Sequence, residues 1–382
     1  MSPRLRPLHV GKFVPPPFAG METHVDTLLR SIAVGADSTL VASEPLPRRA
    51  ADPSVERAYR VRSIRTYAML GSVPLSPGVL AAARQEIDSG RCNLMHVHAP
   101  NPWGDLAILR APAQTPVVMT WHSDIVRQQQ LLKFYGVVQQ KALRRADRVI
   151  VFTPKHFESS SQLGAPELER KVVTVPIGID FERLDATASN EESQAALRSW
   201  AAGRPILLSV GRHVYYKGYQ HLIAALKGMR SEAVLVMIGA GPLSAELQRL
   251  AQELGVADRI RFMGEVDQST LVGALRLCDV FCLPSIEQSE AFGIASAEAM
   301  AYGKPTVVCQ LGNGVNYLNQ EGRTSLVTPP RDEAALSDAL DAIVRDDALR
   351  QRLGDAAATW VRSEFALSKM RDGTLALYRS LC

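Results

Sequence analysis

The chain has 382 residues, of which 46% are apolar and 21% are charged. Because a domain usually has about 100–200 residues, we expect two or three domains and favour two. This composition is that of a globular protein and argues against disorder, collagen and coiled coil. No apolar run approaches the ~20 residues of a membrane helix, and no signal-peptide pattern follows Arg4 and Arg6. We therefore expect a cytoplasmic protein.

The net charge of +4 is unevenly distributed along the chain. Residues 1–185 hold 23 Lys and Arg against 17 Asp and Glu, whereas the remainder holds 20 against 22. The basic first half could face anionic lipid headgroups or a phosphorylated acceptor, or it could be a solvated face. No basic arm, zinc-finger or RNP pattern points to nucleic acid. The five cysteines form no CxxC pair and no zinc spacing, so we interpret them as buried, reduced thiols.

Short apolar, β-branched runs alternate with helical patterns through the first half of the chain. The predicted strands are Leu8–Val14, Leu94–His98, Pro116–Trp121, Arg148–Phe152 and Lys171–Val175. The predicted helices are Glu22–Ile32, Val79–Ile87 and Leu131–Ala146. This alternation is typical of a parallel sheet built from βαβ units.

The second half repeats the same alternation. Its predicted strands are Pro205–Val210, Ala233–Ile238, Arg259–Met263, Val280–Leu283 and Pro305–Val308. Its predicted helices are Gln220–Leu226, Leu243–Leu254, Gln268–Leu277, Ala291–Ala301 and Glu333–Val344. Two such series predict an α/β protein with two doubly wound, Rossmann-like domains.

The domain boundary is expected between Asp180 and Arg204. The polar stretch Asp185–Gln194 is interpreted as a loop or linker, and we divide the domains at residues 183 and 184. Ligands of doubly wound sheets bind beyond the carboxyl ends of the strands. We therefore expect an active site in the cleft between the two domains.

The segment Leu207–Gly218 places two cations at the end of a predicted strand. Arg212 and Lys217 are five residues apart and follow Gly211, which permits a sharp turn. Arg can hold a phosphate through two hydrogen bonds and Lys can act as a point charge, so the pair could converge on one anion. The alternative is a surface loop with two solvated cations.

The segment Pro284–Gly303 contains two glutamates, Glu290 and Glu298, eight residues apart. Gly293 opens the predicted helix that carries Glu298, and the free N–H groups of a helix start attract anions. Glu298 could accept hydrogen bonds from sugar hydroxyls, and Glu290 could reach a second sugar. The alternative is that both carboxylates simply favour the helix dipole.

Turns at the ends of other predicted strands are weaker candidates. Gly239–Pro242, which includes Gly241, could bring backbone close to a ligand or be an ordinary turn. Gly264–Val266 lies at the same sheet edge and could touch a base. Gly20 follows a proline-rich segment and could approach a phosphate, or the segment could be a stiff connection.

Three histidines lie at strand ends in the first half. A histidine at the carboxyl end of a strand can orient a hydroxyl or a sugar, which we consider for His122. His98 ends a neighbouring predicted strand, and we interpret His96 as a core histidine. We find no set of metal ligands and no Asp-x-Asp pair, so a divalent cation bridging a diphosphate is not supported.

Seven motifs occur in order along nearly the whole chain: FAG, HVH, WHSDIV, VPIGID, GRHVYYKG, GAGP and SEAFGIASAEAMAYGKP. Together they resemble the retaining glycosyltransferases of family 4, which share the GT-B fold of two facing Rossmann-like domains. The last motif matches the family's E-x7-E signature. The resemblance also implies that the final helix, residues 367–382, crosses back to the N-terminal domain.

The resemblance implies a role for each matching residue. Arg212 and Lys217 would hold the donor's diphosphate, Glu298 the ribose and Glu290 the donor sugar. Because Glu290 would bind the sugar, we do not assign it as a nucleophile. His122 would lie near the sugar's 6-position and the reacting centre. The remaining donor-binding candidates are Gly20, Gly241, Val266, Gly293 and Ile294. The family usually has Gly-Gly in the first loop, whereas Ala19 takes the first place here.

A fixed positive charge on the departing diphosphate would lower the barrier without a metal, so we expect neither metal nor cofactor. The segments WHSDIVRQQQLLKFY, SEAFG and GNGVNYLNQEG look like mannosyl- and D-rhamnosyltransferases of bacterial O-antigen and exopolysaccharide assembly. These imply a GDP-linked donor and a polyprenyl-diphosphate-linked or glycan acceptor. The alternatives are a UDP-sugar-dependent transferase, a phosphorylase or epimerase of the same fold, and a non-catalytic nucleotide-sugar-binding protein.

Overall fold

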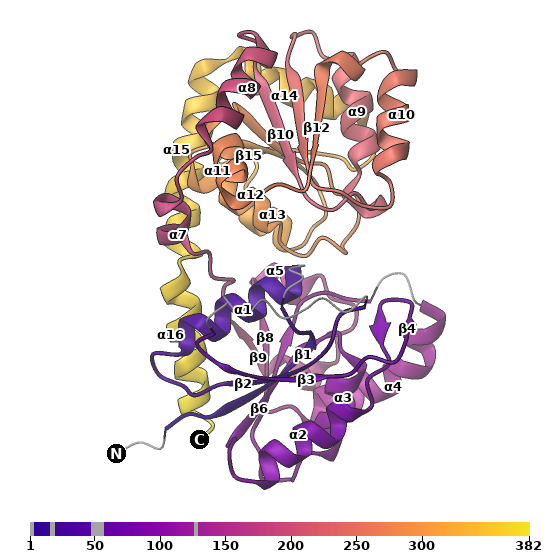
Figure 1. The fold of residues 1–382 in the computed structure, drawn as a ribbon, viewed down its shortest axis with the longest axis vertical. Helices are drawn as coiled ribbons and strands as arrows, with labels where there is room; N and C mark the ends of the chain where they lie inside the picture. The colour runs from indigo at the N-terminus through magenta and orange to yellow at the C-terminus, as the bar shows by residue number, and fades with distance from the viewer. Residues whose placement is uncertain (1–3, 16–19, 47–56, 126–128) are drawn as a thin grey trace. The chain divides into compact units, whose positions relative to one another are not determined.

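The computed structural model describes residues 4–15, 20–46, 57–125 and 129–382, with only the backbone given for 129–134 (Figure 1). The chain forms two compact units: residues 1–178 together with 367–382, and residues 179–366. The chain enters the second unit a few residues before the boundary drawn from the sequence. Asp180 explains this, because its side chain accepts from the Arg183 N–H and starts a helix of the second unit.

The first unit is built on a seven-stranded parallel sheet in the order β3-β2-β1-β6-β7-β8-β9. Its strands are β1 (Pro7–Phe13), β2 (Thr39–Ser43), β3 (Arg60–Ile64), β6 (Leu94–Ala99), β7 (Val117–Trp121), β8 (Arg148–Val151) and β9 (Val172–Thr174). A separate hairpin pairs β4 (Met69–Leu70) with β5 (Val73–Pro74). The strand order reverses between β1 and β6, where such sheets bind ligands.

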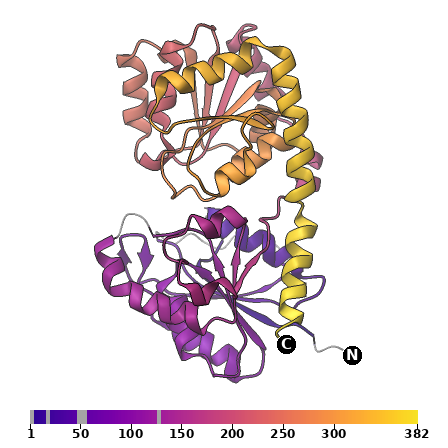
Figure 2. The same cartoon turned by 180° about the vertical axis from the view of Figure 1, so that it is seen from behind.

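Helices cover both faces of this sheet. They are α1 (Gly20–Ile32), α2 (Gly78–Asp88), α3 (Pro102–Arg110), α4 (Gln129–Arg145), α5 (Pro154–Glu158), α6 (Pro166–Glu169) and α16 (Leu367–Arg379). Leu8 and Val10 of β1 pack with α2, α3 and α4, whereas α1 and α16 cover the opposite face, as seen from behind in Figure 2. Side chains alternate along a strand, so His9 points toward α1 and α16.

The second unit has a six-stranded parallel sheet in the order β12-β11-β10-β13-β14-β15. Its strands are β10 (Ile206–Val210), β11 (Val234–Ile238), β12 (Ile260–Gly264), β13 (Val280–Leu283), β14 (Thr306–Cys309) and β15 (Ser325–Thr328). The strand order reverses between β10 and β13. Each sheet is therefore doubly wound, as the sequence predicted.

Helices also flank the second sheet on both faces. They are α7 (Phe181–Ala186), α8 (Glu191–Ala201), α9 (Tyr219–Gly228), α10 (Ser244–Glu253), α11 (Gln268–Leu277), α12 (Ile294–Ala301), α13 (Gly314–Leu318), α14 (Glu333–Arg345) and α15 (Asp347–Glu364). Side chains of α9, α10 and α14 share one apolar core with the strands, and those of α8, α11 and α12 share the other. Among the described helices, none combines the length and apolarity needed to cross a bilayer.

Two predictions about local structure were wrong. The stretch Asp185–Gln194 is mostly helical, because Asn190 caps α8 by accepting from the Ser193 N–H and the acidic residues behind it form the exposed first turn. Helix α12 begins at Ile294 and not at Ala291, because Gly293 has a φ of +88° and cannot belong to a right-handed helix.

Candidate active site

Lys217 and Glu290 meet at the carboxyl edge of the second sheet. Lys217 follows β10 and Glu290 follows β13, the two strands on either side of the reversal in strand order. The Lys217 Nζ lies 2.5 Å from the Glu290 Oε2, and both side chains are largely buried. An ammonium has three N–H donors, so this contact leaves two for a ligand.

Two further side chains fix the position of Glu290. The Ser285 hydroxyl donates to its Oε2 at 3.1 Å, and the Asn313 Nδ2 donates to its backbone oxygen at 2.7 Å. Both carboxylate contacts use Oε2, so Oε1 has no partner among the described residues. Sequence reasoning missed Ser285 and Asn313, although Asn313 before Gly314 is an N-cap signal.

The ion pair keeps Lys217 charged. Burial is the largest single influence and lowers the pKa of Lys217, but the Glu290 carboxylate, together with Tyr219 and Tyr216, raises that pKa above its usual value. Lys217 is therefore a protonated ammonium held beside the Glu290 carboxylate at neutral pH.

A glycine brings the loops after β10 and β13 together. Gly218 has a φ of +68°, and a Cβ there would lie 2.1 Å from the Pro284 oxygen. The Ile286 N–H also donates to the Tyr216 oxygen at 2.8 Å. This close approach of backbone places Lys217 beside the segment that carries Glu290.

Arg212 lies in the same loop after β10 and is exposed. No described residue forms a hydrogen bond or ion pair with its guanidinium. A guanidinium without a partner can hold phosphate oxygens through two parallel hydrogen bonds.

Helix α12 contributes its first turn and one carboxylate to the same sheet edge. Gly293 precedes the helix with a φ of +88°, and a Cβ there would lie 2.7 Å from the Leu283 Cδ2 at the end of β13. The N–H groups of Ile294 and Ala295 have no acceptor among the described residues, as expected at a helix start. A helix start of this kind attracts anions.

Glu298, one turn into α12, is a half-buried carboxylate. Burial raises its pKa from 4.5 to about 7, although Arg183 acts in the opposite direction. No described residue donates a hydrogen bond to it. Glu298 is therefore available to accept from the hydroxyls of a ligand.

The turns after β11 and β12 also lie at this edge. A Cβ on Gly241 would lie 2.5 Å from the His213 oxygen, so this glycine allows one loop to pack closely on another. The Gly239 N–H donates to the Gly264 oxygen at 2.7 Å. Val266 is half-buried and packs against the core formed with α8, α11 and α12.

The N-terminal candidates belong to the first unit. Gly20 is the exposed first residue of α1, while the preceding Phe18 and Ala19 of the FAG motif lie outside the described residues. His122 follows β7, and its backbone N–H donates to the Ala99 oxygen at 2.9 Å. Asp124 accepts from Trp121, Ser160 and Ser161, so its role is structural.

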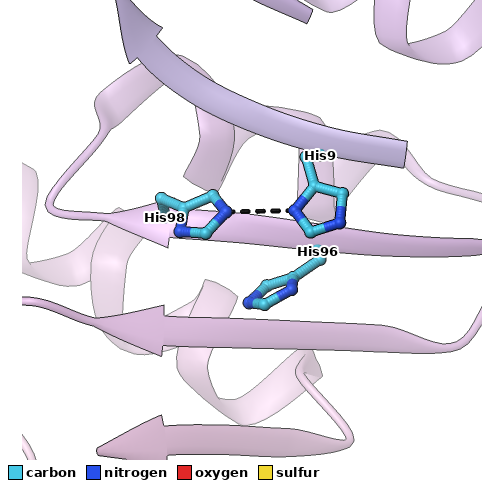
Figure 3. A group of neighbouring side chains, drawn as sticks. All are labelled: His9, His96 and His98. Carbon is cyan, nitrogen blue, oxygen red and sulfur yellow. Dashed lines mark hydrogen bonds between the residues drawn. The ribbon is translucent and has the colours of Figure 1, made fainter. Parts of the chain in front are cut away.

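Histidines gather on the α1 and α16 face of the first sheet (Figure 3). His9 pairs in register with His96 on the neighbouring strand, and His98 lies two residues further on the same face. The His9 Nδ1 and the His98 Nε2 are 3.1 Å apart. As predicted, His96 is a satisfied core histidine, since its ring nitrogens contact the Tyr378 and Thr120 hydroxyls.

Two triplets of histidines bring their ring nitrogens within 4.8 Å of one another: His9, His96 and His98, and His24, His98 and His122. No such set was expected from the sequence, because the spacing of residues along a chain does not show which strands are neighbours. No carboxylate belongs to either triplet.

Two units, each with a parallel, doubly wound sheet, and a sheet edge that combines cations with carboxylates are the features expected of a glycosyltransferase of the GT-B fold. Residues 18–183 match the model of Glycosyltransferase Family 4, and residues 191–360 match that of Glycosyl transferases group 1. The chain belongs to the family 4 glycosyltransferases, as its motifs predicted.

Curated relatives include enzymes of bacterial glycan assembly. The chain is 28% identical to O-antigen chain mannosyltransferase C of Escherichia coli over 99% of both chains. It is 35% identical to D-rhamnosyltransferase WbpZ of Pseudomonas aeruginosa over 66% of this chain and 64% of that one. Among solved structures, sucrose-phosphate synthase from Thermosynechococcus elongatus has the same fold, with a TM-score of 0.79, 23% identity and 99% of both chains covered.

Proposed function

We propose that the protein is a retaining hexosyltransferase that moves mannose or D-rhamnose from a GDP-sugar to a lipid-linked or glycan acceptor in bacterial polysaccharide assembly. The names of the two relatives support the sugar and the biological process. One observation carries the proposal: Lys217 and Glu290, at the carboxyl edge of β10 and β13, hold each other in place, yet each keeps hydrogen-bonding atoms that no described residue uses.

The donor's diphosphate is bound by Arg212, Lys217 and the first turn of α12. The ammonium is held by Glu290 at 2.5 Å, so its position is set before the donor arrives. The Arg212 guanidinium has no partner to give up among the residues that the structure describes. Positive charge that is fixed in advance stabilises the departing diphosphate at no cost of rearrangement, so the reaction proceeds without a metal.

The sugar and ribose are bound by the carboxylates. Glu290 Oε1 accepts from a hydroxyl of the donor hexose, and Glu298 accepts from the ribose. Gly20 and Gly241 lie beside the donor, and Val266 contacts the base. His122 of the first unit lies near the 6-position of the hexose and the reacting centre.

In the reaction, the bond between the anomeric carbon and the phosphate oxygen breaks and leaves an oxocarbenium-like sugar. The acceptor hydroxyl attacks from the side of the leaving group, which retains the anomer, and its proton passes to a β-phosphate oxygen. Retaining glycosidases instead use a second carboxylate as nucleophile. Glu290 is already engaged by Lys217 and Ser285 and serves to bind the sugar.

A thermal-shift series with GDP, UDP and ADP tests the choice of base. A ligand at ~100 times its dissociation constant adds ~2.7 kcal/mol to stability, so the preferred nucleotide gives the largest rise in melting temperature. We expect that nucleotide to be GDP. Stabilisation by UDP alone would mean that the donor is a UDP-sugar and not a GDP-sugar.

Transfer is tested with GDP-mannose and a polyprenyl-diphosphate-linked glycan, and the anomeric configuration of the product is read by NMR. Inversion at the anomeric carbon would contradict the retaining mechanism. Sugar release that needs phosphate but no acceptor would instead identify a phosphorylase. Tight donor binding without turnover on any acceptor would identify a binding protein.

The acceptor side of the protein works at the cytoplasmic face of the membrane through the β4–β5 hairpin. Its side chains Tyr67 and Leu70 are 66% and 59% exposed, and the Arg65 guanidinium lies 5.2 Å from the centre of the Tyr67 ring. Exposed apolar and aromatic residues beside a cation suit an anionic lipid surface. The nearby arginines of β3 are engaged elsewhere, since Arg60 and Arg62 pair with Glu86.

Flotation with vesicles of phosphatidylcholine and phosphatidylglycerol tests this contact. Leu70→Asp should reduce the fraction of protein that floats with the vesicles, because a charge replaces an apolar side chain at the hairpin tip. Val34→Asp is the matched control, since Val34 is 79% exposed on the same unit but outside the hairpin. Equal flotation of both variants would contradict the hairpin's role.

A further inference from the structure

A continuous chain of hydrogen bonds runs through the first unit from His122 to Thr120. The His122 Nε2 lies 3.2 Å from the His98 Nδ1, and the His98 Nε2 lies 3.1 Å from the His9 Nδ1. The Tyr378 hydroxyl of α16 joins the His9 Nε2 at 3.3 Å to the His96 Nδ1 at 2.5 Å. The His96 Nε2 contacts the Thr120 hydroxyl at 2.6 Å.

Each imidazole of this chain is neutral. Burial lowers the pKa of His9 to about 3, and it takes the pKa of His96, His98 and His122 well below the usual value. A neutral imidazole has one N–H donor and one acceptor nitrogen. Three orders keep every bond of the chain: every proton directed toward His122, every proton directed away from it, or both His9 and His96 donating to the Tyr378 hydroxyl, whose oxygen has two lone pairs.

The two hydroxyls of the hydrogen-bond chain distinguish these orders. If His9 and His96 both donate to Tyr378, the buried O–H of Tyr378 has no acceptor among the described residues. If the protons are directed away from His122, the Thr120 hydroxyl accepts from His96, and its own buried O–H has no acceptor among the described residues. If they are directed toward His122, the Thr120 O–H donates to the His96 Nε2, and only lone pairs stay unused. Orphaned buried donors are rarer and more costly than under-used acceptors, so the order with every proton directed toward His122 is favoured.

We infer that this buried chain is a positioning device that fixes the tautomer of His122. The His98 Nδ1–H donates to the His122 Nε2, and the proton of His122 therefore resides on Nδ1. No described residue bonds this Nδ1, and His122 is only partly buried. His122 thus presents a hydrogen-bond donor to an oxygen of the substrate and does not act as a base. This last step rests on the proposed function, which places His122 beside the donor sugar.

The same histidines have the spacing of a metal site, but the hydrogen bonds already use the nitrogens that an ion would need. Both nitrogens of His96 and both of His98 have partners within 3.2 Å. His24 lies edge-on to the His122 ring and makes no hydrogen bond through its buried Nδ1. Metal binding at either triplet would break the chain of hydrogen bonds.

The tautomer is measured directly by NMR on the full chain labelled with [15N]histidine. The chain has eight histidines, and a His122→Gln sample identifies the signals of His122. We expect a protonated Nδ1 and an unprotonated Nε2 in the wild-type protein. A His122 protonated on Nε2, or a charged His122 at neutral pH, would overturn the inference whether or not the protein transfers sugar.

A pair of variants tests His98 as the group that sets this tautomer. In His98→Leu the donor to the His122 Nε2 is lost, so we expect Nε2-protonated His122 to appear. In His98→Gln the amide can donate in its place, and we expect the Nδ1 tautomer to be kept. An unchanged tautomer in a folded His98→Leu protein would contradict the role of His98.

Kinetics then connect the tautomer to transfer. His98→Leu should lower kcat by about tenfold, as for the loss of one hydrogen bond made in the transition state, while His98→Gln stays close to the wild type. If His98→Leu loses the Nδ1-protonated form of His122 without any change in kcat, this tautomer does not contribute to catalysis and the inferred positioning role is overturned. Titration with Co²⁺ completes the test. A tetrahedral cobalt spectrum in the wild-type protein that is lost in His9→Gln would show that these histidines form a metal site and would overturn the inference.

Discussion

The two units have the same doubly wound topology, yet the edges where their strand orders reverse are chemically opposite. The second unit places Lys217, Glu290 and Arg212 at the same sheet edge as the first turn of α12, so this edge carries charged groups. The first unit places neutral, hydrogen-bonded histidines on β1 and β6. In the proposed mechanism, the charged edge stabilises a leaving diphosphate. The neutral edge orients His122, which acts as an uncharged hydrogen-bond donor.

The comparison shows how one topology supports two kinds of chemistry. Charge at the second edge persists because an ion pair counteracts burial at Lys217. At the first edge no carboxylate takes part in the described hydrogen-bond chain, so burial keeps the imidazoles neutral. The following variants test this contrast, in order of decreasing expected effect.

Lys217→Met should remove the fixed charge of the second unit. We expect the transfer rate to fall by about 10³-fold, which is the upper range for losing one preorganised electrostatic contact in the transition state. The matched control is Lys227→Met, since Lys227 is exposed on α9 of the same unit. If Lys217→Met transferred sugar as fast as the control, the charge of this edge would not be catalytic.

Gly218→Ala should disturb the loop that positions this charge. The new Cβ combines a φ of +68° with a clash 2.1 Å from the Pro284 oxygen, so we expect a loss of about 3 kcal/mol in unfolding free energy. Gly255→Ala has the same strain, with a φ of +70° but no neighbour within 4 Å, and should cost about 1 kcal/mol. Urea denaturation measures both, and equal losses would show that the contact with Pro284 is unimportant.

Tyr378→Phe tests the hydrogen bonds of the histidines in the first unit. Removing the hydroxyl leaves the buried His96 Nδ1 without its partner, so we expect a loss of about 1–3 kcal/mol in unfolding free energy. Tyr67→Phe, at an exposed site of the same unit, should change it little. A Tyr378→Phe protein as stable as the wild type would mean that the hydrogen bonds on this face contribute nothing to the fold.

Glu298→Gln separates binding from stability at the charged edge. The folded-state pKa of Glu298 is raised from 4.5 to about 7, so its ionisation costs the folded state free energy that is absent below pH 4.5 and fully present above pH 7. Gln avoids this cost, and we expect about 1 kcal/mol of extra stability at pH 8, allowing for partial exposure. At pH 4.5 the gain should vanish.

Urea denaturation at both pH values measures this difference, with the exposed Glu232→Gln as control. Nucleotide binding should weaken in Glu298→Gln even as stability rises. A destabilised Glu298→Gln protein at pH 8 would show that the carboxylate has a structural partner and is not reserved for a ligand.

Much of the second unit could be predicted from the sequence, because its cations and carboxylates directly follow apolar strands in short motifs. Lys217 and Glu290 come from the ends of β10 and β13, and a parallel sheet brings such ends to one edge. The histidine chain could not be predicted in this way. His9 and Tyr378 lie at opposite ends of the sequence and meet only because β1 pairs with β6 and α16 packs in the first unit.

The errors also have local causes. Helix α8 was missed because its first turn is polar and exposed, so it lacked the apolar periodicity on which the prediction relied. Strand β3 was missed because two of its five side chains are arginines, which pair with Glu86. Ser285 and Asn313 were overlooked because they contact Glu290 and have no charge of their own.

The central claim is that Arg212 and Lys217 bind a diphosphate. The most direct measurement is isothermal titration calorimetry with the nucleoside diphosphate that most stabilises the protein and, separately, with its nucleoside. We expect the diphosphate to bind at least ~100-fold more tightly, a difference of about 2.7 kcal/mol, and Arg212→Met and Lys217→Met each to remove much of that difference while leaving nucleoside binding unchanged. If the two ligands bind wild-type protein equally, or if both variants keep the full difference, the account is contradicted.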